Sequence, residues 1–482
     1  MYRVGIAGFG VVGLAGLKFF VERPRELRSF LGLSQDAEIC FVIWDKKTYP
    51  EEHRALLQAC KVTWINAATC SLSGFLVQVD RALVSPGVNL ASLDFVERAK
   101  TFCELDLFAS CFIGKTIGIT GSLGKTTVTK LIYKIIQRFY SLQGGTERVA
   151  LGGNVGVGML DLLRADELPT LAVLELSSFQ LEMSTQFVPS IGVWTNLFPN
   201  HLDRHGDMPS YFKAKANLFC NAEAIVLGMQ LFDQTLRSLT LQFLSAIQGR
   251  LVVAGADILP DDLISIVPRS EWEMISAQNG FLTNFLVKQG RIVDTQPLIS
   301  LPALPLCTFI QNWATIFASL SLAGVDLAWL AKDIQHAAVM YQPDDHKHRI
   351  EFVRQCGGVD FYNDSKSTVK ESTLAAVEQM ARIYKRVHVV IGGLGKGVDR
   401  TDFTRLLETF SAVVSIVAFG KEAHLLGAKI SVATLEDALD RVLKHVQPGD
   451  VVLFSPGGTS YDLFTIYTQR GDRFKEIVAQ LK

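Results

Sequence analysis

Residues 116–127 read TIGITGSLGKTT, and this stretch decides the fold. Its first five residues predict a buried strand, and residues 128–137 have the pattern of a helix. The glycine-rich turn between them exposes backbone N–H groups at the start of the helix, where a phosphate group is stabilised. Such a turn can also do no more than close a strand–helix unit, but the strand and the helix around it favour nucleotide binding.

Two side chains of this turn have the chemistry of a phosphate loop. Lys125 is placed to reach the β- and γ-phosphates of a nucleotide, and the Thr126 hydroxyl is placed to ligate Mg²⁺. The turn departs from the general Walker pattern, because that pattern has glycine where this chain has Ile119. Only two residues separate Gly121 from Gly124.

Strands alternate with helices outward from this turn in both directions. The strand-like runs lie at residues 2–7, 40–44, 82–87, 116–120, 170–174, 191–196, 387–391, 413–418 and 451–454. This alternation predicts parallel sheets in three α/β blocks, with boundaries near residues 103 and 345. Residues 341–347 are polar, contain a proline and resemble a linker. Residues 281–287, flanked by Asn-Gly and Gln-Gly, predict a β-hairpin within the looser region 222–305, to which we assign no chemistry.

Length and composition agree with three folded blocks. A chain of 482 residues is too long for a single hydrophobic core. Its content of 49% hydrophobic and 20% charged residues excludes a disordered chain. A net charge of -1 argues against a protein that coats nucleic acid. There is no apolar run of about 20 residues, no signal-peptide pattern and no Cys-x-x-Cys pair among eight scattered cysteines. We therefore expect a cytoplasmic protein without a nucleic-acid partner or membrane insertion.

Acids and bases cluster at two further strand ends. Glu175 ends a buried strand at 171–174, where a carboxylate can hold Mg²⁺, although an isolated acid there can also be solvated. Residues 195–206 contain His201 and His205, and we interpret His205 as a structural hydrogen-bonding residue. Lys215 lies on a helix predicted over 209–220, and its position alone gives it no special role, because lysines on helices are usually solvated.

Five motifs occur in the order and spacing of the Mur ligases. They are GSLGKTT at 121–127, ELSSFQLE at 175–182, HLDR at 201–204, NDSK at 363–366 and SPGGTS at 455–460. The chain resembles this family along its length, apart from region 222–305. The resemblance implies an α/β fold with an N-terminal Rossmann-like domain that binds a UDP-sugar (1–103), a central P-loop ATPase-like domain that binds ATP (104–345) and a C-terminal Rossmann-like domain that binds an amino acid (346–482).

The resemblance also implies an activity and its ligands. The activity is ATP-dependent amide-bond ligation through an acyl phosphate, in the synthesis of peptidoglycan precursors. The implied substrates are UDP-N-acetylmuramoyl-L-alanine and D-glutamate, and the implied cofactors are ATP, two Mg²⁺ ions and a carbamylated lysine. We expect a monomer.

Matching motif positions assign the site residues. The catalytic residues are Lys125, His201, Lys215 and Asn154, and the metal ligands are Thr126, Glu175, His201 and Lys215 as its carbamate. The residues assigned to ATP are Gly121, Ser122, Gly124, Lys125, Thr126, Thr127, Asn312, Arg349 and Asp364. The UDP-substrate residues are Val11, Val12, Asp45, Gly87 and Asn154. The amino-acid residues are Lys366, Thr368, Lys396, Ser460 and Tyr461.

Several positions depart from the family pattern. Leu123 replaces an Asn in the phosphate loop, Asn200 replaces an Asp, and Tyr467 replaces a Phe beside the amino-acid site. Gln311 and Thr315 replace a His and an Asn around Asn312, the residue that the resemblance assigns to the adenine contact.

Other motifs and chemistries leave alternative functions open. Gly8, Gly10 and Gly13 with Asp45 suggest a dehydrogenase, but Asp45 lies 32 positions beyond Gly13, further than the roughly 20 of the dinucleotide fingerprint. A sister ligase that adds a different amino acid, a folylpolyglutamate-type enzyme and a non-catalytic P-loop module are the remaining alternatives. Lys366 and Lys396 suit a dianionic amino acid, whereas its D configuration rests on the resemblance alone.

Overall fold

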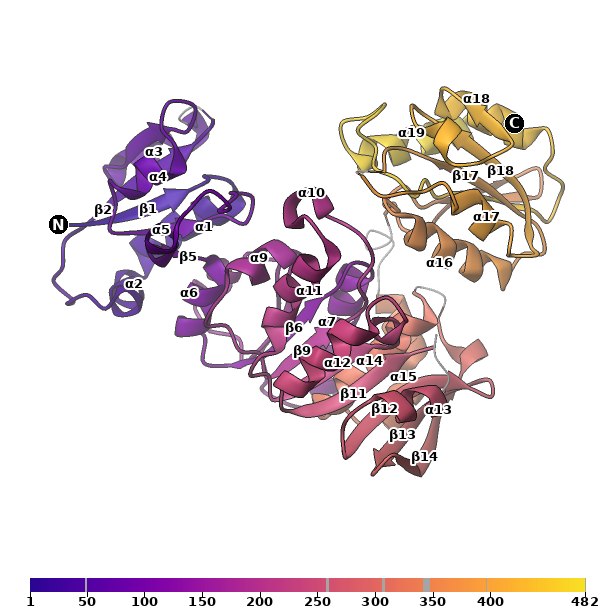
Figure 1. Ribbon diagram of the computed structural model, residues 1–482, viewed down its shortest axis with the longest axis horizontal. Coiled ribbons are helices and arrows are strands. Elements are labelled where there is room, and N and C mark those ends of the chain that lie inside the picture. Colours follow the sequence, from indigo (N-terminus) through magenta and orange to yellow (C-terminus); the bar gives the residue numbers. More distant parts are fainter. Residues whose placement is uncertain (48–49, 257–259, 306–307, 341–346, 396, 482) are drawn as a thin grey trace. The chain divides into compact units, whose positions relative to one another are not determined.

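The computed structural model describes residues 1–47, 50–256, 260–305, 308–340, 347–395 and 397–481, and it contains three largely parallel sheets (Figure 1). The α/β fold class expected from the alternating pattern is confirmed. Most of the expected linker at 341–347, and Lys396, lie outside the described residues.

The first sheet has five parallel strands in the order β3-β2-β1-β4-β5, which is the strand order of a Rossmann fold without its sixth strand. Its strands are β1 (Tyr2–Ala7), β2 (Ile39–Asp45), β3 (Thr63–Asn66), β4 (Arg81–Val84) and β5 (Thr101–Phe102). The helices are α1 (Val11–Glu22), α2 (Pro24–Leu31), α3 (Arg54–Ala59), α4 (Leu72–Leu76) and α5 (Phe95–Ala99). β1 is buried from Val4 to Ala7, as its apolar sequence predicts.

The second sheet has nine strands in the order β14-β13-β12-β11-β10-β9-β6-β8-β7. Its strands are β6 (Lys115–Thr120), β7 (Val149–Gly153), β8 (Leu171–Glu175), β9 (Ile191–Trp194), β10 (Ala224–Gly228), β11 (Arg250–Gly255), β12 (Glu271–Gln278), β13 (Phe281–Lys288) and β14 (Arg291–Ser300). The helices are α6 (Glu104–Cys111), α7 (Lys125–Leu142), α8 (Met159–Leu162), α9 (Ser178–Met183), α10 (Leu202–His205), α11 (Met208–Ala216), α12 (Arg237–Ala246), α13 (Pro260–Ile266), α14 (Ile310–Leu322) and α15 (Leu327–Met340). The strand β6, which precedes the phosphate loop, lies between β8 and β9 and is parallel to both.

The predicted hairpin is confirmed, but it extends the main sheet. β12, β13 and β14 are antiparallel to one another, and β12 is parallel to β11. The turns at Asn279-Gly280 and Gln289-Gly290 have positive φ at both central residues, 50° and 80° in the first and 48° and 72° in the second. Two-residue turns with positive φ at both positions match the twist of the strands that they join.

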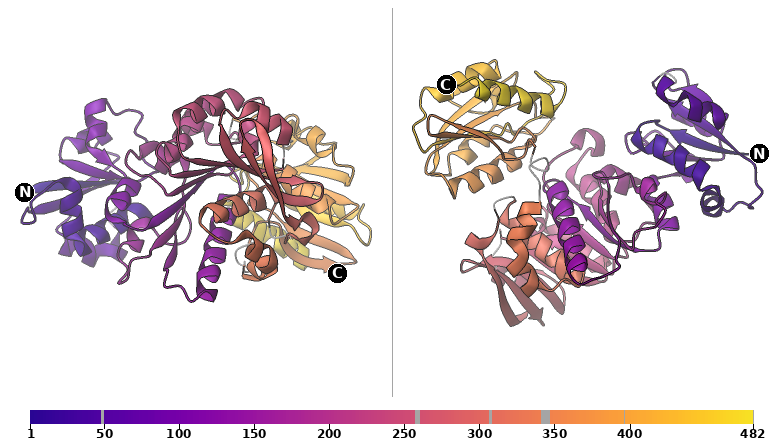
Figure 2. Two further views of the ribbon diagram at one scale, coloured as in Figure 1. Left: turned by 90° about the horizontal axis from the view of Figure 1, so that it is seen from below. Right: turned by 180° about the vertical axis from the view of Figure 1, so that it is seen from behind.

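The third sheet has six strands in the order β15-β16-β20-β17-β18-β19, and only β15 is antiparallel to its neighbour. Its strands are β15 (Glu351–Cys356), β16 (Val359–Asn363), β17 (Val387–Gly392), β18 (Val413–Phe419), β19 (Ile430–Val432) and β20 (Val451–Phe454). The helices α16 (Lys370–Ala381) and α17 (Phe403–Leu407) cover one face, and α18 (Leu435–Leu443) and α19 (Tyr467–Ala479) cover the other (Figure 2). Both faces are therefore buried, which explains the uninterrupted apolar runs of β17 and β20.

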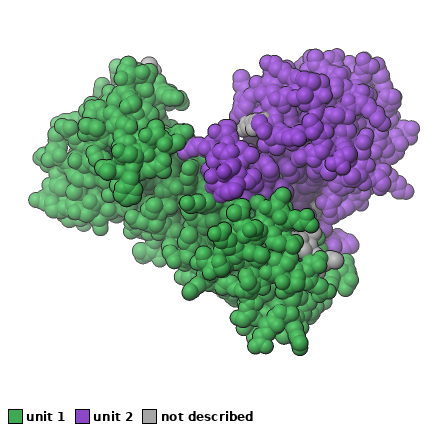
Figure 3. Space-filling view, in the orientation of Figure 1, with its two compact units in different colours: residues 1–196, 212–300, 314–331 green, residues 197–211, 301–313, 332–482 purple. Residues whose placement is uncertain are grey.

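The chain forms two compact units (Figure 3). The first consists of residues 1–196, 212–300 and 314–331, and the second of residues 197–211, 301–313 and 332–482. Within the described ranges, no helix has the length and apolar character needed to cross a membrane.

Candidate active site

The phosphate loop has the strand–turn–helix geometry that its sequence predicts. It connects β6 to α7, and its glycines Gly121 and Gly124 have φ values of +145° and +78°, which favour glycine. A Cβ on Gly121 would lie 2.0 Å from the Thr195 hydroxyl. The first turn of α7, from Lys125 to Val128, carries no acid, so its N–H groups and the helix dipole favour an anion.

The end of β9 holds the loop through its backbone, a role that sequence reasoning missed. The side chain of Asn196 accepts a hydrogen bond from the Leu123 N–H (2.8 Å) and donates one to the Leu123 carbonyl (3.2 Å). The Thr195 hydroxyl donates to the same carbonyl (2.7 Å). These contacts use only the backbone of Leu123, so the Leu at this position keeps the loop geometry. The position of Thr195 and Asn196 directly after a buried strand was the available signal.

The assigned lysine Lys125 begins α7, and its Nζ donates to the Ser122 carbonyl at 3.1 Å. Thr126 and Thr127 follow in the first helical turn, with Thr127 buried. The structure therefore brings together Gly121, Ser122, Gly124, Lys125, Thr126 and Thr127 in one loop, as predicted.

Lys215 lies beneath this loop, and the expectation of a solvated lysine is wrong for it. Its side chain is 1% exposed, whereas Lys213 on the same helix α11 is exposed. Its Nζ donates to the Gly121 carbonyl at 2.9 Å and lies 3.3 Å from the Thr120 hydroxyl. Burial, and then the positive charge of Lys125, hold the pKa of Lys215 well below the usual value for lysine, while Glu175 opposes them. The helix is also shorter than predicted, because α11 ends at Ala216 and a 3₁₀ turn follows.

Glu175 provides a buried carboxylate beside the loop, so it is not the solvated strand end considered as an alternative. It ends β8, pairs in register with Ile119 of β6, and is 2% exposed. Its Oε1 accepts a hydrogen bond from Asn154 Nδ2 at 2.9 Å. Its Oε2 is buried without a hydrogen-bond partner among the described residues.

These oxygens fit a divalent cation. An unpaired buried carboxylate oxygen is costly unless a ligand approaches it, and oxygen donors are those that Mg²⁺ prefers. Across the described ranges, no three His, Cys, Asp or Glu side chains gather into a metal site. A Mg²⁺ ion here would find a carboxylate donor in Glu175 and would take further oxygen ligands from nucleotide phosphates and water.

His201 belongs to the second compact unit. It caps α10 with a φ of +55°, unusual for a residue with a side chain, and its N–H donates to Asn200 Oδ1 at 3.0 Å. His201 lines a small cavity together with Thr368 and Arg400. The His205 ring packs against the Tyr211 ring, with centroids 5.1 Å apart.

The predicted amino-acid residues lie on loops that follow strands of the third sheet. Lys366 comes after β16, with its Nζ 5.4 Å from the centre of the Tyr467 ring. Ser460 is buried in the loop after β20, whereas Tyr461 next to it is 64% exposed. Thr368 lines the small cavity described above.

Asp364 and Arg349, both assigned to ATP, lie close to this group. The Asp364 carboxylate is 5% exposed and accepts hydrogen bonds from Ser367 and Ser455. Burial raises the pKa of Asp364 to about 6, against the lowering effect of those hydrogen bonds. Arg349 lies between His348 and Ile350, which have φ values of +63° and +44°.

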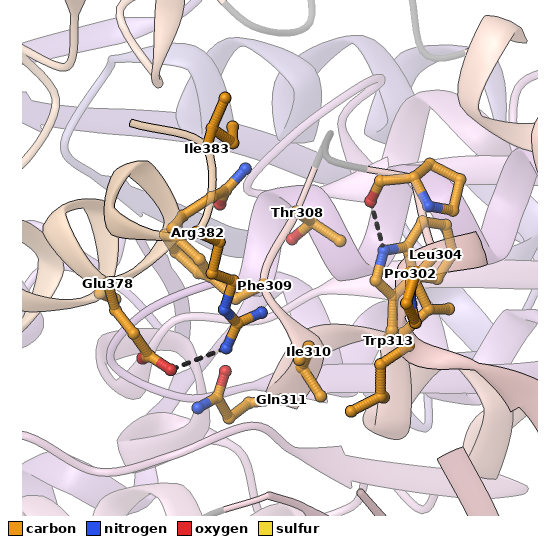
Figure 4. Close-up of a pocket in the computed structure, with 14 residues that line it drawn as sticks. Pro302, Leu304, Thr308, Phe309, Ile310, Gln311, Trp313, Glu378, Arg382 and Ile383 are labelled. Atoms are coloured by element: carbon orange, nitrogen blue, oxygen red, sulfur yellow. Dashed lines mark hydrogen bonds and ion pairs between the residues drawn. The ribbon is translucent and has the colours of Figure 1, made fainter. Parts of the chain in front are cut away.

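Asn312 adjoins a pocket of about 500 Å³ in the second unit (Figure 4). Residues from 301–305 and 308–313, together with α16 and the two residues that follow it, line this pocket. The ion pair of Arg382 and Glu378 lies on the side of the pocket away from Trp313. Gln311 lines the pocket, whereas the Asn312 amide is 5% exposed and donates to the Thr308 hydroxyl at 2.8 Å. Gln311, which departs from the family pattern, therefore forms the pocket wall here, and Asn312 does not.

Four of the predicted UDP-substrate residues, Val11, Val12, Asp45 and Gly87, lie at or just after the ends of strands β1, β2 and β4, whereas Asn154 follows β7 of the second sheet. Asp45 Oδ2 accepts the Phe9 N–H at 2.6 Å, so this carboxylate fixes the loop before α1. Val11 is 81% exposed at the start of α1, followed by Val12. Gly87 lies in the turn after β4, with open space where a Cβ would be.

The fold and the phosphate loop place the protein in the P-loop class of nucleotide-binding proteins. The model of the Mur ligase middle domain matches residues 119–253, and that of the Mur ligase glutamate ligase domain matches residues 348–458. The UDP-N-acetylmuramoylalanine–D-glutamate ligase of Acidobacterium capsulatum is 32% identical, with 83% of this chain and 82% of that protein covered. The chain therefore belongs to the Mur ligase family, whose members are ATP-dependent ligases.

Further similarities agree with this assignment. The ligase of the same name from Caldicellulosiruptor bescii is 28% identical, with 99% of this chain and 98% of that protein covered. The MurF ligase of Thermotoga maritima in complex with ADP has a TM-score of 0.52 at 16% identity and covers 91% of this chain and 97% of its own. MurF of Acinetobacter baumannii has a TM-score of 0.54 at 17% identity, with coverages of 92% and 90%. The two MurF structures show that the fold is shared.

Proposed function

We propose that the protein ligates D-glutamate to UDP-N-acetylmuramoyl-L-alanine with hydrolysis of ATP, in the synthesis of peptidoglycan precursors. The γ-phosphoryl group is transferred to the substrate carboxylate, the amine of D-glutamate attacks this acyl phosphate, and the tetrahedral intermediate releases phosphate. The relatives from Acidobacterium capsulatum and Caldicellulosiruptor bescii carry the name of this reaction. The proposed location is the cytoplasm, where ATP and both water-soluble substrates are available, and the proposed form is a monomer.

The observation that carries the proposal is the combination of the phosphate loop with Glu175 and Lys215. Lys125 supplies a positive charge for the transferring phosphoryl group, and the N–H groups at the start of α7 hold phosphate oxygens. Bound Mg²⁺ would neutralise phosphate charge next to Glu175 and Thr126. Asn154 fixes the Glu175 carboxylate through its hydrogen bond. His201 is proposed as a further ligand and catalytic residue, on the resemblance alone.

We propose that Lys215 carries a carbamate. Its lowered pKa supports this, because only the uncharged amine has the lone pair that attacks CO₂. The N–C bond forms, one proton leaves the nitrogen to water, and a carboxylate results. The product is an anion suited to a hard cation, which the ammonium form is not.

The remaining assignments complete the proposal. The residues proposed to bind the UDP-substrate are Val11, Val12, Asp45, Gly87 and Asn154. The residues proposed to bind the amino acid are Lys366, Thr368, Lys396, Ser460 and Tyr461. Asn312, Arg349 and Asp364 are proposed as ATP contacts, with the pocket beside Gln311 as the adenine site. The proposed domains are 1–103, 104–345 and 346–482.

The test is a product assay with a panel of amino acids. The enzyme is incubated with ATP, Mg²⁺ and UDP-N-acetylmuramoyl-L-alanine, plus L-Ala, D-Glu, L-Glu, L-Lys or meso-diaminopimelate. Phosphate release and the mass of the product are measured. D-Glu should be ligated fastest, and a faster rate with any other amino acid would show a sister ligase. Absence of phosphate release with every amino acid would show a non-catalytic nucleotide-binding protein.

A further inference from the structure

Three loops lie at the same edge of the third sheet. They follow the carboxyl ends of the neighbouring strands β16, β20 and β17, and we call them the strand-end loops: residues 364–367, 455–460 and 393–395. Two of them carry Lys366 and Ser460, and the third leads into Lys396, which lies outside the described residues. Two buried arginines together donate hydrogen bonds to all three loops. Arg470 donates to the first two, and Arg400 donates to the second and the third.

Arg470 lies on α19 and is 1% exposed. Its Nη2 donates to the Ser365 carbonyl at 2.8 Å and its Nη1 to the Gly458 carbonyl at 2.9 Å. Its Nε has no hydrogen-bond partner, and no carboxylate of the described chain forms an ion pair with it. Asp462 and Asp364 supply negative charge nearby, but the direct contacts of this guanidinium are to backbone carbonyls and not to a carboxylate.

Arg400 lies between β17 and α17 and is 5% exposed. Its Nη1 donates to the carbonyls of Gly392 and Gly457, both at 3.2 Å. Its Nη2 donates to the Gly393 carbonyl at 2.6 Å and to Glu422 at 2.8 Å. Glu422 in turn accepts the Gly395 N–H at 2.8 Å, next to Lys396 in the sequence.

These contacts fix the peptide planes of the loops at both ends, because the C=O and N–H of a trans peptide point in opposite directions. The Ser365 carbonyl accepts from Arg470, and the Lys366 N–H of the same peptide donates to the His348 carbonyl at 2.9 Å. The Gly458 carbonyl accepts from Arg470, and the following N–H, that of Thr459, donates to the Leu394 carbonyl at 2.9 Å.

A third peptide plane is held in the same way by Arg400. The Gly393 carbonyl accepts from its Nη2, and the Leu394 N–H donates to the Thr459 carbonyl at 2.9 Å. The glycines leave room for the two guanidiniums. A Cβ on Gly458 would lie 2.3 Å from Arg400 Nη1, and one on Gly393 would lie 2.9 Å from Arg470 Nη1.

We infer that Arg470 and Arg400 are positioning residues that set the strand-end loops, and with them the groups that bind the incoming amino acid. The inference rests on the proposed function for the identity of that ligand. The planar fork of arginine suits this role, because it donates in fixed directions to two carbonyls at once. A lysine would present a single point charge and could not orient both carbonyls. Neither arginine needs to touch the amino acid.

The experiment compares Arg470→Met and Arg470→Lys with Arg473→Met in the full-length protein. Arg473 lies on the same helix but on the surface, where it pairs with Glu436 and Glu476. The KM for the amino acid ligated by the wild type should rise about 10- to 100-fold in Arg470→Met, because displaced binding groups lose their alignment. The KM values for ATP and for the UDP-substrate should change less than about twofold. Arg470→Lys should be intermediate, and Arg473→Met should match the wild type.

Hydrogen exchange supplies a readout that does not depend on activity. Amides of residues 364–367, 393–395 and 455–460 should exchange faster in Arg470→Met than in Arg473→Met, while those of β17 and β20 stay protected. Unchanged exchange in the loops would overturn the inference whether or not the protein ligates D-glutamate. Faster exchange with all KM values unchanged would also overturn it, because the arginine would then stabilise the loops without positioning the ligand groups. If the wild type ligates no amino acid, the proposed function fails, and faster exchange would still support the loop-setting role.

Discussion

At the scale of single residues, Lys125 is the most direct test of the phosphate loop. The variant Lys125→Ala removes a positive charge at the start of α7 while leaving the loop backbone, which Thr195 and Asn196 hold, in place. We expect kcat/KM to fall about 10²–10³-fold or more, as for loss of one group that stabilises transition-state charge. Steady-state phosphate release measures this. Lys134→Ala, on the same helix, is the control, and equal activities of the two variants would rule out the assignment.

The buried Lys215 side chain should lower the stability of the folded protein, although the proposed function requires it. Its pKa is lowered in the folded protein, so between that value and the usual value of lysine the unfolded state binds one more proton than the folded state. Stability from this group therefore rises with pH, by about 1.4 kcal/mol per pH unit in that window. In CO₂-free buffer, Lys215→Met should be more stable than the wild type at neutral pH, and the difference should shrink as the pH rises toward 10.5. Urea unfolding at several pH values measures it, and a difference that does not depend on pH would contradict a buried neutral amine.

The carbamate gives a separate prediction for the same residue. Lys215→Ala should be nearly inactive, and acetate or formate should restore part of the activity, because a free carboxylate can occupy the space of the lost one. With ¹³C-labelled bicarbonate, the wild type should show a carbamate carbon signal that Lys215→Ala lacks. Lys213→Ala should keep both activity and signal, since its side chain is exposed. A lost signal in Lys213→Ala would assign the modification to Lys213 instead.

At the scale of elements, a buried cluster joins the starts of β17, β18 and β20. Asp450 is 2% exposed and accepts hydrogen bonds from His388 (2.8 Å) and Arg386 (2.9 Å), and His388 also contacts Ser415 (2.7 Å). We expect Asp450→Asn to lower the free energy of unfolding by about 2–3 kcal/mol, the value of charged hydrogen bonds. Asp440→Asn on the exposed side of α18 should change it by less than about 0.5 kcal/mol.

The same cluster predicts a pH dependence. Burial raises the pKa of Asp450, but the bonds from His388, the Gln447 N–H and Arg386 outweigh it, and the pKa is lowered below 3.8. A carboxyl group with a lowered pKa adds stability above its unfolded pKa and loses it as the pH falls through the folded one. The contribution of the Asp450 carboxylate to the difference between wild type and Asp450→Asn should therefore shrink below about pH 4. Chemical denaturation at these pH values measures it, and a constant difference down to low pH would contradict the prediction.

Elements were predictable where the sequence carries a local pattern. β17 and β20 are uninterrupted apolar runs, and the Asn-Gly and Gln-Gly turns mark β13 at both ends. Burial of a particular polar side chain carried no such signal. α11 reads MPSYFKAKA, with apolar residues on several sides, so nothing in it marks Lys215 as the inward-facing lysine. Arg400 and Arg470 were also missed, because most of their partners are backbone carbonyls of loops, which no residue type identifies.

At the scale of the whole molecule, the proposed C-terminal domain has a core of its own. The clusters on both faces of the third sheet, including their partly buried members, are formed entirely by residues between Ile350 and Leu481. About 140 residues are enough to bury a stable core. In contrast, the core of the first sheet includes Met183, and Glu22 pairs with Arg164, so this part depends on residues beyond 103.

These cores predict different behaviour for two fragments. Residues 346–482 alone should fold, with a single sigmoidal urea transition and near-ultraviolet circular dichroism of packed aromatic rings such as Phe454 and Phe474, whose centroids lie 4.7 Å apart. Residues 1–103 alone should unfold at lower urea concentration, because they lose Met183 from the core and Arg164 from the surface pair. A broad transition without near-ultraviolet signal in 346–482 would show that this segment needs residues 197–211 or 301–313, with which it forms one compact unit. The domain boundary near 345 would then have to be redrawn around those segments, because a sheet with both faces covered by its own helices would still have failed to fold alone.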